Sequence, residues 1–493
     1  MKNILLAGIL VLFTLISCEK LETINKNPNN VSETHPQLLL TGIEWNAFQV
    51  TGTGPLYASR MILQTDGENV NQYYKWDRGS FDDYDDLRNV TKMMEEAKRI
   101  ENPEYEALAK FFRAYYFYNL SLSFGDIPYS DALKGESERV FTPSYDQQKD
   151  VFTGILNELK EADDLLVDQA ALIEGDIIYN GDPYQWRKLI NSFRLKVLLS
   201  LSKHESDAAM TIGSKFAEIA GNKPLLESNT DNGQLVFIDQ VGSRYTEYNN
   251  SGYGSGMYMD STLIKRLQER EDPRLFIFCS QTRNAKEGGL AINDFAAYEG
   301  GNPVAPYNDV NLKAIAGNAS KVNLRYTTDP VNEPAVLMGY SELQLILAEA
   351  RVRGWITAGD AGTYYAKGVN ASFTFYNQYA ENYAQYVDES AAVNYLSGDM
   401  VNFANANTTE EQIALIIYQK YFGSFLQGGW TMYFDHLRTG YPAFASLPGE
   451  TPPARWMYPN SEYQLNKQNV SDAIARQFGE GNDKIRQIPW WLK

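Results

Sequence analysis

Cysteine and histidine are scarce in this chain, with 2 cysteines and 3 histidines among 493 residues. Structural zinc sites and disulfide frameworks are built from these residue types, so the sequence offers little material for either. His35, His204 and His436 lie far apart, and no metalloprotease, nucleophile-elbow or phosphate-loop motif accompanies them. Cys279 follows the apolar residues 275–278 and is interpreted as a small buried residue. We therefore predict no catalytic residue, no metal site and no cofactor.

Positive charge is also in short supply. The chain has 44 lysines and arginines against 62 aspartates and glutamates, a formal charge of −18. Nucleic-acid binding needs a basic surface, so this charge balance argues against it. An anionic membrane surface would repel the chain as well. A neutral ligand is the type that fits this composition best.

Apolar runs long enough to span a bilayer, which takes about 20 residues, are missing. The run 4–16 has 13 residues and follows Lys2, as in the core of a secretory signal peptide. It ends in Leu15-Ile16-Ser17-Cys18, which resembles the lipobox of bacterial lipoproteins, where cleavage precedes the cysteine. We predict a signal peptide over 1–17 and a lipid-modified Cys18 that anchors the chain without crossing the membrane. The alternative is an ordinary secretory signal followed by a chance cysteine.

The rest of the sequence predicts a polar tether over 18–36 and a single, mainly α-helical domain over 37–493. Within that domain, glycine, asparagine and proline dominate residues 222–335, which predicts a loop-rich, ligand-facing region with few short strands. Paired helices of about 15–20 residues favour an irregular array of tetratricopeptide-like units. Apolar residues at helical spacing predict helices near 37–50, 82–100, 104–124, 144–168, 183–203, 205–220, 261–270, 340–353, 359–385, 408–427 and 470–478.

The helix near 104–124 has an aromatic face that we expect to be buried against other helices. That face is formed by Leu108, Phe111, Phe112, Tyr115, Asn119 and Leu122. Gly125 is expected to end this helix in a left-handed conformation, and Pro128 prevents its continuation. Further along, Ser341 and Gln344 match a capping box at the start of the helix near 340–353.

Aromatic residues are abundant, with 33 tyrosines and 8 tryptophans, and they supply the main functional signal. Rings on loops beside hydrogen-bonding side chains can form a platform for sugar faces or peptide side chains. The alternative is that these rings pack the loops onto the body of the protein. The predicted ligand-binding residues are Tyr73, Tyr74, Trp76 and Arg78 in one polar segment, and Tyr245, Tyr248, Tyr253 and Tyr258 in a glycine-rich one.

Short motifs follow one another along the chain in an order that resembles a known family. They are INKNPNN (24–30), GDIPYSDA (125–132), WRKLINSFRL (186–195), LAEA (347–350), RGW (353–355), GVNAS (368–372), RTGYP (438–442), Arg455 with YP (458–459), and WW (490–491). Each motif is weak alone, but their shared order is specific. In this order they resemble the SusD/RagB family of Bacteroidetes outer-membrane lipoproteins, in its second SusD-like branch. One departure is Leu437, which precedes Arg438 where the family often has another arginine.

This resemblance implies a helical lipoprotein of the outer membrane that captures nutrient oligomers, most often glycans, for a SusC-like TonB-dependent transporter. Glu19 and Glu22 resemble the acidic export signal of such lipoproteins, so we expect the protein to face outward. Family members bind ligand without cleaving it, and RagB-like members take peptides. Because the motifs belong to the helical framework, the resemblance assigns no ligand-contacting residue.

Other functions stay open at this point. The chain could bind oligopeptides in the RagB-like manner, or serve only as a helical adaptor for its transporter. A surface glycosidase is also possible from sequence, because a catalytic carboxylate pair is defined by its separation in space and not along the chain.

Overall fold

The computed structural model describes residues 33–50 and 52–493. The predicted signal peptide (1–17), the lipid-modified Cys18 and most of the 18–36 tether lie outside these residues. The described chain is mainly helical, as predicted. None of its described helices combines the length and the apolar character needed to cross a membrane.

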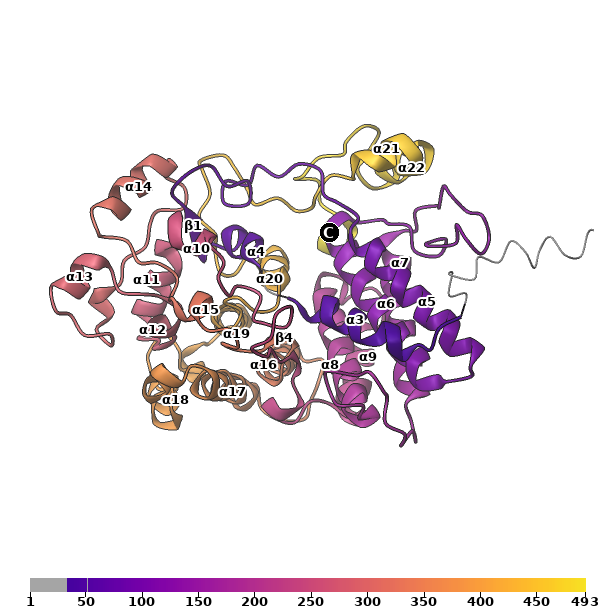
Figure 1. Ribbon diagram of the computed structural model, residues 1–493, viewed down its shortest axis with the longest axis horizontal. Helices are drawn as coiled ribbons and strands as arrows, with labels where there is room; N and C mark the ends of the chain where they lie inside the picture. Colours follow the sequence, from indigo (N-terminus) through magenta and orange to yellow (C-terminus); the bar gives the residue numbers. More distant parts are fainter. Residues whose placement is uncertain (1–32, 51) are drawn as a thin grey trace, which may run out of the picture.

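The N-terminal helices gather on one side of the molecule, at the right in Figure 1. They are α3 (Gln37–Phe48), α5 (Asp83–Arg99), α6 (Pro103–Phe124), α7 (Gln148–Leu165), α8 (Pro183–Ser200) and α9 (Ile212–Asn222); the short α4 (Thr53–Ala58) lies nearer the centre. α6 packs between α5 and α7, and α7 also packs on α8. Only residues 100–102 connect α5 to α6, so the second helix folds back on the first. These neighbours are the helix pairs that the sequence predicts.

α6 begins where local signals place it. The Asn102 side chain accepts hydrogen bonds from two backbone N–H groups of the first turn, which Pro103 opens. The helix ends at Gly125, as predicted, but the predicted left-handed conformation is wrong, because φ is 99° and ψ is −125°. A β-carbon at this position would meet Gln477 Oε1 at 2.3 Å. Gly125 is therefore required both by its backbone angles and by its contact with the C-terminal region.

Residues 222–335 form short elements, as predicted, but more of them are helical than the sequence indicates. The helix predicted near 261–270 is α11 (Ser261–Glu269), and side-chain caps such as Asp260 and Thr282 start short helices between turns. The other helices are α10 (Gly252–Ser255), α12 (Arg274–Phe278), α13 (Arg283–Glu287), α14 (Tyr307–Ile315) and α15 (Arg325–Thr328). Two antiparallel strand pairs join β1 (Ile62–Gln64) to β3 (Met257–Met259) and β2 (Gly233–Leu235) to β4 (Ala335–Met338).

The C-terminal helices complete the array and return to the N-terminal ones. They are α16 (Tyr340–Val352), α17 (Ala361–Tyr379), α18 (Glu389–Leu396), α19 (Thr409–Gly423), α20 (Thr431–Thr439), α21 (Asn460–Leu465) and α22 (Lys467–Phe478). α16 packs against both α17 and α19, while α20 contacts α4 and α8. Figure 1 shows α20 and β4 between the N-terminal helices and the rest of the array. Short 3-10 helices occupy 202–204, 229–231, 295–297, 381–386, 403–405 and 490–492.

The capping box predicted for α16 is wrong. Gly339 occupies the cap position, and the Ser341 hydroxyl donates instead to the carbonyl oxygen of Gly368 at 2.7 Å. A capping box does open α19, where Thr408 and Glu411 each accept from the other's backbone N–H group. Ser341 follows the first residue of α16 and is not its cap residue. Its hydrogen bond to the Gly368 carbonyl oxygen joins α16 to α17.

Buried ion pairs connect α20 to its neighbours. Arg438 Nη2 on α20 lies 2.8 Å from Glu349 Oε2 on α16 and 2.8 Å from Asp435 Oδ1. Arg438 Nη1 donates to Ser202 Oγ, and Asp435 also pairs with Lys420 of α19. The arginine side chain is 1% exposed, so its charge is balanced inside the protein and not by solvent.

Glu342 of α16 extends this network to the N-terminal helices. Its Oε1 lies 3.1 Å from Lys196 Nζ on α8 and 3.8 Å from Lys420 Nζ on α19. Burial opposes the ionisation of Asp435, yet Lys420 and Arg438 outweigh it and hold its pKa at about 2. We call this set of residues the ion-pair network: Lys196, Glu342, Glu349, Lys420, Asp435 and Arg438. It joins helices from both halves of the sequence.

A pair of buried carboxyl groups lies where α3 contacts the loop 173–182. Asp176 accepts hydrogen bonds from backbone N–H groups of this loop and from Trp186 Nε1, the latter at 2.9 Å. Glu44 accepts one from the Ile177 N–H at 2.7 Å. Burial, and then the charge of Asp176, raise the pKa of Glu44 well above its usual value. Glu44 therefore keeps its proton at pH values where an unfolded chain has lost it.

Replacing Arg438 by alanine should lower the free energy of unfolding by about 3–5 kcal/mol, because Glu349 and Asp435 would remain buried without their partner. Chemical denaturation followed by circular dichroism measures this change. Lys160→Ala is the matched control, since Lys160 pairs with Asp164 in the solvent and its loss should leave stability nearly unchanged. An effect of Arg438→Ala no larger than that of the control would contradict the network's role.

Glu44→Gln should leave the protein at least as stable as the wild type at pH 8. The raised pKa means that wild-type stability falls by up to about 1.4 kcal/mol per pH unit above the unfolded-state pKa, until the folded-state pKa is passed. Glutamine has no proton to lose, so this slope should flatten in the variant. Denaturation midpoints between pH 5 and 8 test this, with Glu174→Gln in the same loop, an exposed side chain, as control. A variant less stable than wild type at pH 8 would contradict the protonated state of Glu44.

Candidate functional site

A deep pocket, which we call the aromatic pocket, lies between the N-terminal helices and the C-terminal elements. Its volume is about 1410 Å³ including the open mouth. Residues of α5, α6 and α8 form one wall, while β4, α20 and the preceding segment 428–430 form much of the other. The aromatic side chains that line it are Tyr115, Tyr118, Phe124, Phe193, Trp430, Phe434 and Trp456. Of this space, about 490 Å³ is cavity volume, which lies within the roughly 300–1,000 Å³ that ligand pockets measure.

A turn with adjacent glycines presents one of the tryptophans. Gly428 and Gly429 have φ angles of 68° and 54°, a region that residues with side chains rarely adopt. The Gly429 N–H donates to the carbonyl oxygen of Val50 at 2.9 Å, which fixes the turn against the N-terminal part of the chain. Trp430 then meets Trp456 edge to face, with ring centroids 4.7 Å apart. The turn thus positions Trp430, while the Trp456 N–H donates to the Ser123 carbonyl oxygen of α6 at 2.9 Å.

Trp76 supports these rings from behind. It stacks on Trp456 with centroids 3.9 Å apart and meets Trp430 edge to face at 5.3 Å. Its side chain is itself nearly buried, at 7% exposure. Trp76 lies more than 300 residues before Trp430 and Trp456 in the sequence, and the three rings pack together in one wall.

Polar groups stand at the edge of the aromatic pocket. Asn119 of α6, the α5 residue Asp83 and its neighbour Asp82, and Lys196 of α8 contribute to the lining. Burial, followed by the charges of Asp86 and Asp82, raises the pKa of Asp83 to about 7. The pocket therefore combines flat apolar surfaces with groups that can donate and accept hydrogen bonds.

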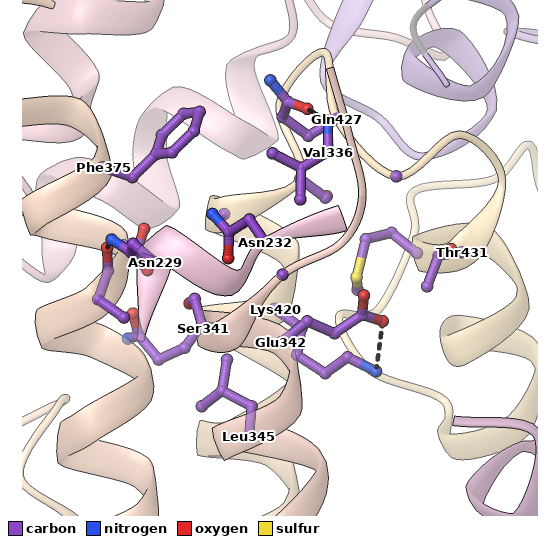
Figure 2. Close-up of a pocket in the computed structure, with 18 of the residues that line it drawn as sticks. Asn229, Asn232, Val336, Ser341, Glu342, Leu345, Phe375, Lys420, Gln427 and Thr431 are labelled. Atoms are coloured by element: carbon purple, nitrogen blue, oxygen red, sulfur yellow. Dashed lines mark hydrogen bonds and ion pairs between the residues drawn. The ribbon is translucent and has the colours of Figure 1, made fainter. Parts of the chain in front are cut away.

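A second, smaller pocket lies between α16, α17 and α19, and we call it the amide pocket (Figure 2). Its volume is about 680 Å³ including the mouth, and both pockets are bordered by Gly428 and Thr431. Asn229 and Gln427 line it, but their amide groups already donate to backbone carbonyl oxygens at 2.9 Å. Few of its hydrogen-bonding groups thus remain for a ligand.

Figure 2 also shows how the ion-pair network reaches the amide pocket. The dashed line joins Glu342 to Lys420, at 3.8 Å, with Thr431 beside them. Lys196, on the other side of the same glutamate, lines the aromatic pocket. The network therefore lies between the two pockets.

The first group of predicted ligand residues packs into the protein next to the aromatic pocket. Tyr74 is 3% exposed, and its hydroxyl donates to a backbone carbonyl oxygen at 2.9 Å. The half-buried Tyr73 donates in the same way at 2.8 Å, and Arg78 pairs with Asp483 at 2.9 Å. Trp76 lies behind the pocket wall, as described above. In this conformation the group supports the pocket without lining it.

The second predicted group is divided by burial. Tyr245 and Tyr253 are 1% and 3% exposed, because the glycine-rich segment folds onto the core. Tyr248 and Tyr258 are half-buried, and Arg244 lies over the Tyr248 ring at 5.2 Å. The buried rings offer no surface to a ligand in this structure. For the half-buried ones, ligand binding stays a prediction.

The region 222–335 was expected to face the ligand, yet it supplies no described residue of the aromatic pocket. Its Asn229 and Asn232 line the amide pocket instead. Their neighbours in that lining come from α16, α17, α19 and the turn at 427–428.

Sequence reasoning missed Tyr115 and Asn119 as pocket residues because their helix face was expected to be buried. The helix does bury Phe111 and Phe112, but further along the same face opens into the pocket. Trp430 had a usable signal, since two glycines directly before a tryptophan indicate an exposed turn that presents a ring. Trp456 has no such local signal.

The described residues contain no group of three or more histidine, cysteine, aspartate or glutamate side chains placed to hold a metal ion. His204 stacks on Trp490 with centroids 3.9 Å apart. Burial lowers the pKa of His436 to about 4, and its Nδ1 lies 2.8 Å from the Pro442 carbonyl oxygen. Cys279 is buried, as predicted.

Comparison with protein families gives a match over most of the chain. A family model described as "SusD-like_2: Starch-binding associating with outer membrane" matches residues 28–459. A comparison with curated proteins finds no match.

Solved structures of the same fold are numerous. A SusD homologue of Bacteroides fragilis is 56% identical with a TM-score of 0.90, over 94% of this chain and 100% of that one. An outer-membrane protein of Bacteroides vulgatus, described in terms of nutrient binding, is 51% identical with a TM-score of 0.90, over 93% and 100%. A chitin-binding protein is 24% identical with a TM-score of 0.70, over 93% and 99%, and shows the shared fold alone.

Proposed function

This chain belongs to the SusD-like family of nutrient-binding proteins associated with the outer membrane, and we propose that it is a cell-surface lipoprotein that binds nutrient glycans. It would deliver them to a SusC-like TonB-dependent transporter. The aromatic pocket is the observation that carries this proposal. The family description names binding and no reaction, so the proposed role is capture without cleavage.

The lining of the aromatic pocket suits a chain of sugars. Aromatic rings stack on the apolar faces of pyranose rings, and Trp430 and Trp456 present two such surfaces nearly at right angles, with an interplanar angle of 85°. Asn119 and Ser123 on the α6 wall of the same pocket can exchange hydrogen bonds with sugar hydroxyl groups. A cavity volume of about 490 Å³ is in the usual range of ligand pockets and leaves room for a short glycan segment.

The lipid anchor and the outward orientation are part of the same proposal. Cys18 directly follows the apolar run of the signal sequence, and 18 residues separate it from the start of α3 at Gln37. Such a segment, extended by up to about 3.3–3.6 Å per residue, allows the folded domain to stand clear of the membrane surface.

Trp430→Ala should weaken glycan binding by about threefold to tenfold, because one stacking surface is lost. Isothermal titration of the mature protein against cello-, malto-, xylo- and chito-oligosaccharides and against oligopeptides measures this. Tyr184→Ala is the control, since Tyr184 is exposed and lies outside the pocket lining.

The titrations also separate the possible functions. Heat with glycans that Trp430→Ala reduces and the control does not would support the proposal. Heat with peptides alone would establish the RagB-like function instead. Release of shorter sugars during incubation would establish a glycosidase, and no heat with any ligand would favour a purely structural adaptor.

Cys18→Ser should move the protein from the outer-membrane fraction to soluble fractions, because acylation needs the cysteine thiol. Metabolic labelling with a fatty acid and fractionation of cells measure this, and protease treatment of intact cells measures surface exposure. Cys279→Ser is the control, as that cysteine is buried in the domain. If the wild-type protein carried no fatty-acid label, the proposed lipid anchor at Cys18 would be refuted.

A further inference from the structure

The aromatic pocket has an unbalanced negative charge. Asp82 and Asp83 are the acidic residues of its lining. In the described part of the chain neither side chain makes an ion pair, and the Asp82 carboxylate accepts a hydrogen bond from Ser80 Oγ at 2.6 Å. Both stand at the start of α5. Burial and the charges of Asp86 and Asp82 raise the pKa of Asp83 to about 7, so at pH 7.5 most of the Asp83 carboxyl groups, though not all, are ionised. Any charged ligand in the pocket would meet these acids directly.

Lys196, the basic residue of the lining, is already neutralised. Its Nζ lies 3.1 Å from Glu342 Oε1 and 3.1 Å from Thr431 Oγ1, and its side chain is only 8% exposed. Glu342 faces the amide pocket and shares its other side with Lys420. A ligand carboxylate would have to break this buried arrangement to gain the lysine as a partner, which is unfavourable.

The aromatic rings of the pocket also disfavour an anionic ligand. Ring faces carry the negative part of the aromatic quadrupole, so Trp430 and Trp456 attract polarised C–H groups and repel anions. The protein as a whole has a formal charge of −18, which lowers the local concentration of anionic ligands at long range. Carboxylates, ring faces and overall charge therefore all oppose an anionic ligand, and no described lining residue offers it an unpaired positive charge.

We propose that the aromatic pocket selects uncharged glycans and rejects glycans that carry carboxylate or sulfate groups. This inference rests on the proposed glycan-binding function and adds the class of glycan. Discrimination should amount to about tenfold or more in affinity, the size expected when like charges lie within several ångströms near a protein surface.

The test uses pairs of oligosaccharides that differ only at C6. Cellohexaose, maltohexaose and β-1,4-mannohexaose are each compared with the corresponding uronic acid oligomer, by isothermal titration of the mature protein at pH 7.5 and 50 mM salt. The uncharged member of a bound pair should bind at least about tenfold more tightly. The double variant Asp82→Asn/Asp83→Asn keeps the shape of both side chains. In it, the ratio of the affinities for the uncharged and the uronic acid oligomer should fall to about threefold or less. Asp85→Asn is the control.

The control removes one negative charge from the same helix. Asp85 is exposed and lies outside the pocket lining, so its replacement should leave the ratio of the two affinities unchanged. Thermal denaturation checks that each variant is folded.

The outcomes separate this inference from the function it rests on. A uronic acid oligomer that binds as tightly as its uncharged counterpart would overturn the charge selection and leave glycan capture intact. An equal fall in the affinity ratio in Asp85→Asn would overturn the role of the pocket acids, since the effect would then come from overall charge. If neither member of any pair bound, and the xylo- and chito-oligosaccharides gave no heat either, the proposed function would fail, and this inference with it.

Discussion

The ion-pair network is the interaction on which the arrangement of this protein depends. Its charges lie on four different helices, α8, α16, α19 and α20. The contacts between these helices are therefore tertiary contacts. Arg438 makes hydrogen bonds to Glu349, Asp435 and Ser202 from a fully buried position. Because buried charges must be paired, the helices can approach only in an orientation that completes every pair. The network therefore determines how the two halves of the chain meet.

The two pockets lie where the N-terminal and C-terminal helices pack against each other. The aromatic pocket lies where α5, α6 and α8 face α20, and the amide pocket lies across Glu342 from it. Two motifs that sequence comparison treats as separate, LAEA and RTGYP, are joined through Glu349 and Arg438. Their part is to hold helices together, and neither motif supplies a described residue of the aromatic-pocket lining. Ligand choice belongs instead to the residues in the lining.

Burial divides the aromatic residues into two kinds that look alike in the sequence. Tyr74, Tyr245 and Tyr253 pack loops onto the body, while Trp430 and Trp456 line the pocket. Trp76 lies between these kinds: it was expected to contact ligand, and it holds the rings that line the pocket. A polar neighbourhood along the chain indicates that a ring could be exposed, but a loop can fold back over its own rings, as the segment around Tyr245 does.

The sequence by itself determined the features that depend on neighbours along the chain. Helix starts such as Asn102-Pro103, the end of α6 at Gly125, the mainly helical class and the family all follow from local spacing and from the order of short motifs. The capping box expected at Ser341 failed because the serine found a partner on α17, which no local pattern contains. The tertiary structure alone decided the site, since Tyr115 lies about 300 residues before Trp430 and Trp456 in the sequence and lines the same pocket only in the folded chain. Side-chain exposure depends on how the helices and loops pack together. It can be predicted from the sequence only where a local turn, such as Gly428-Gly429, directs the next side chain outward.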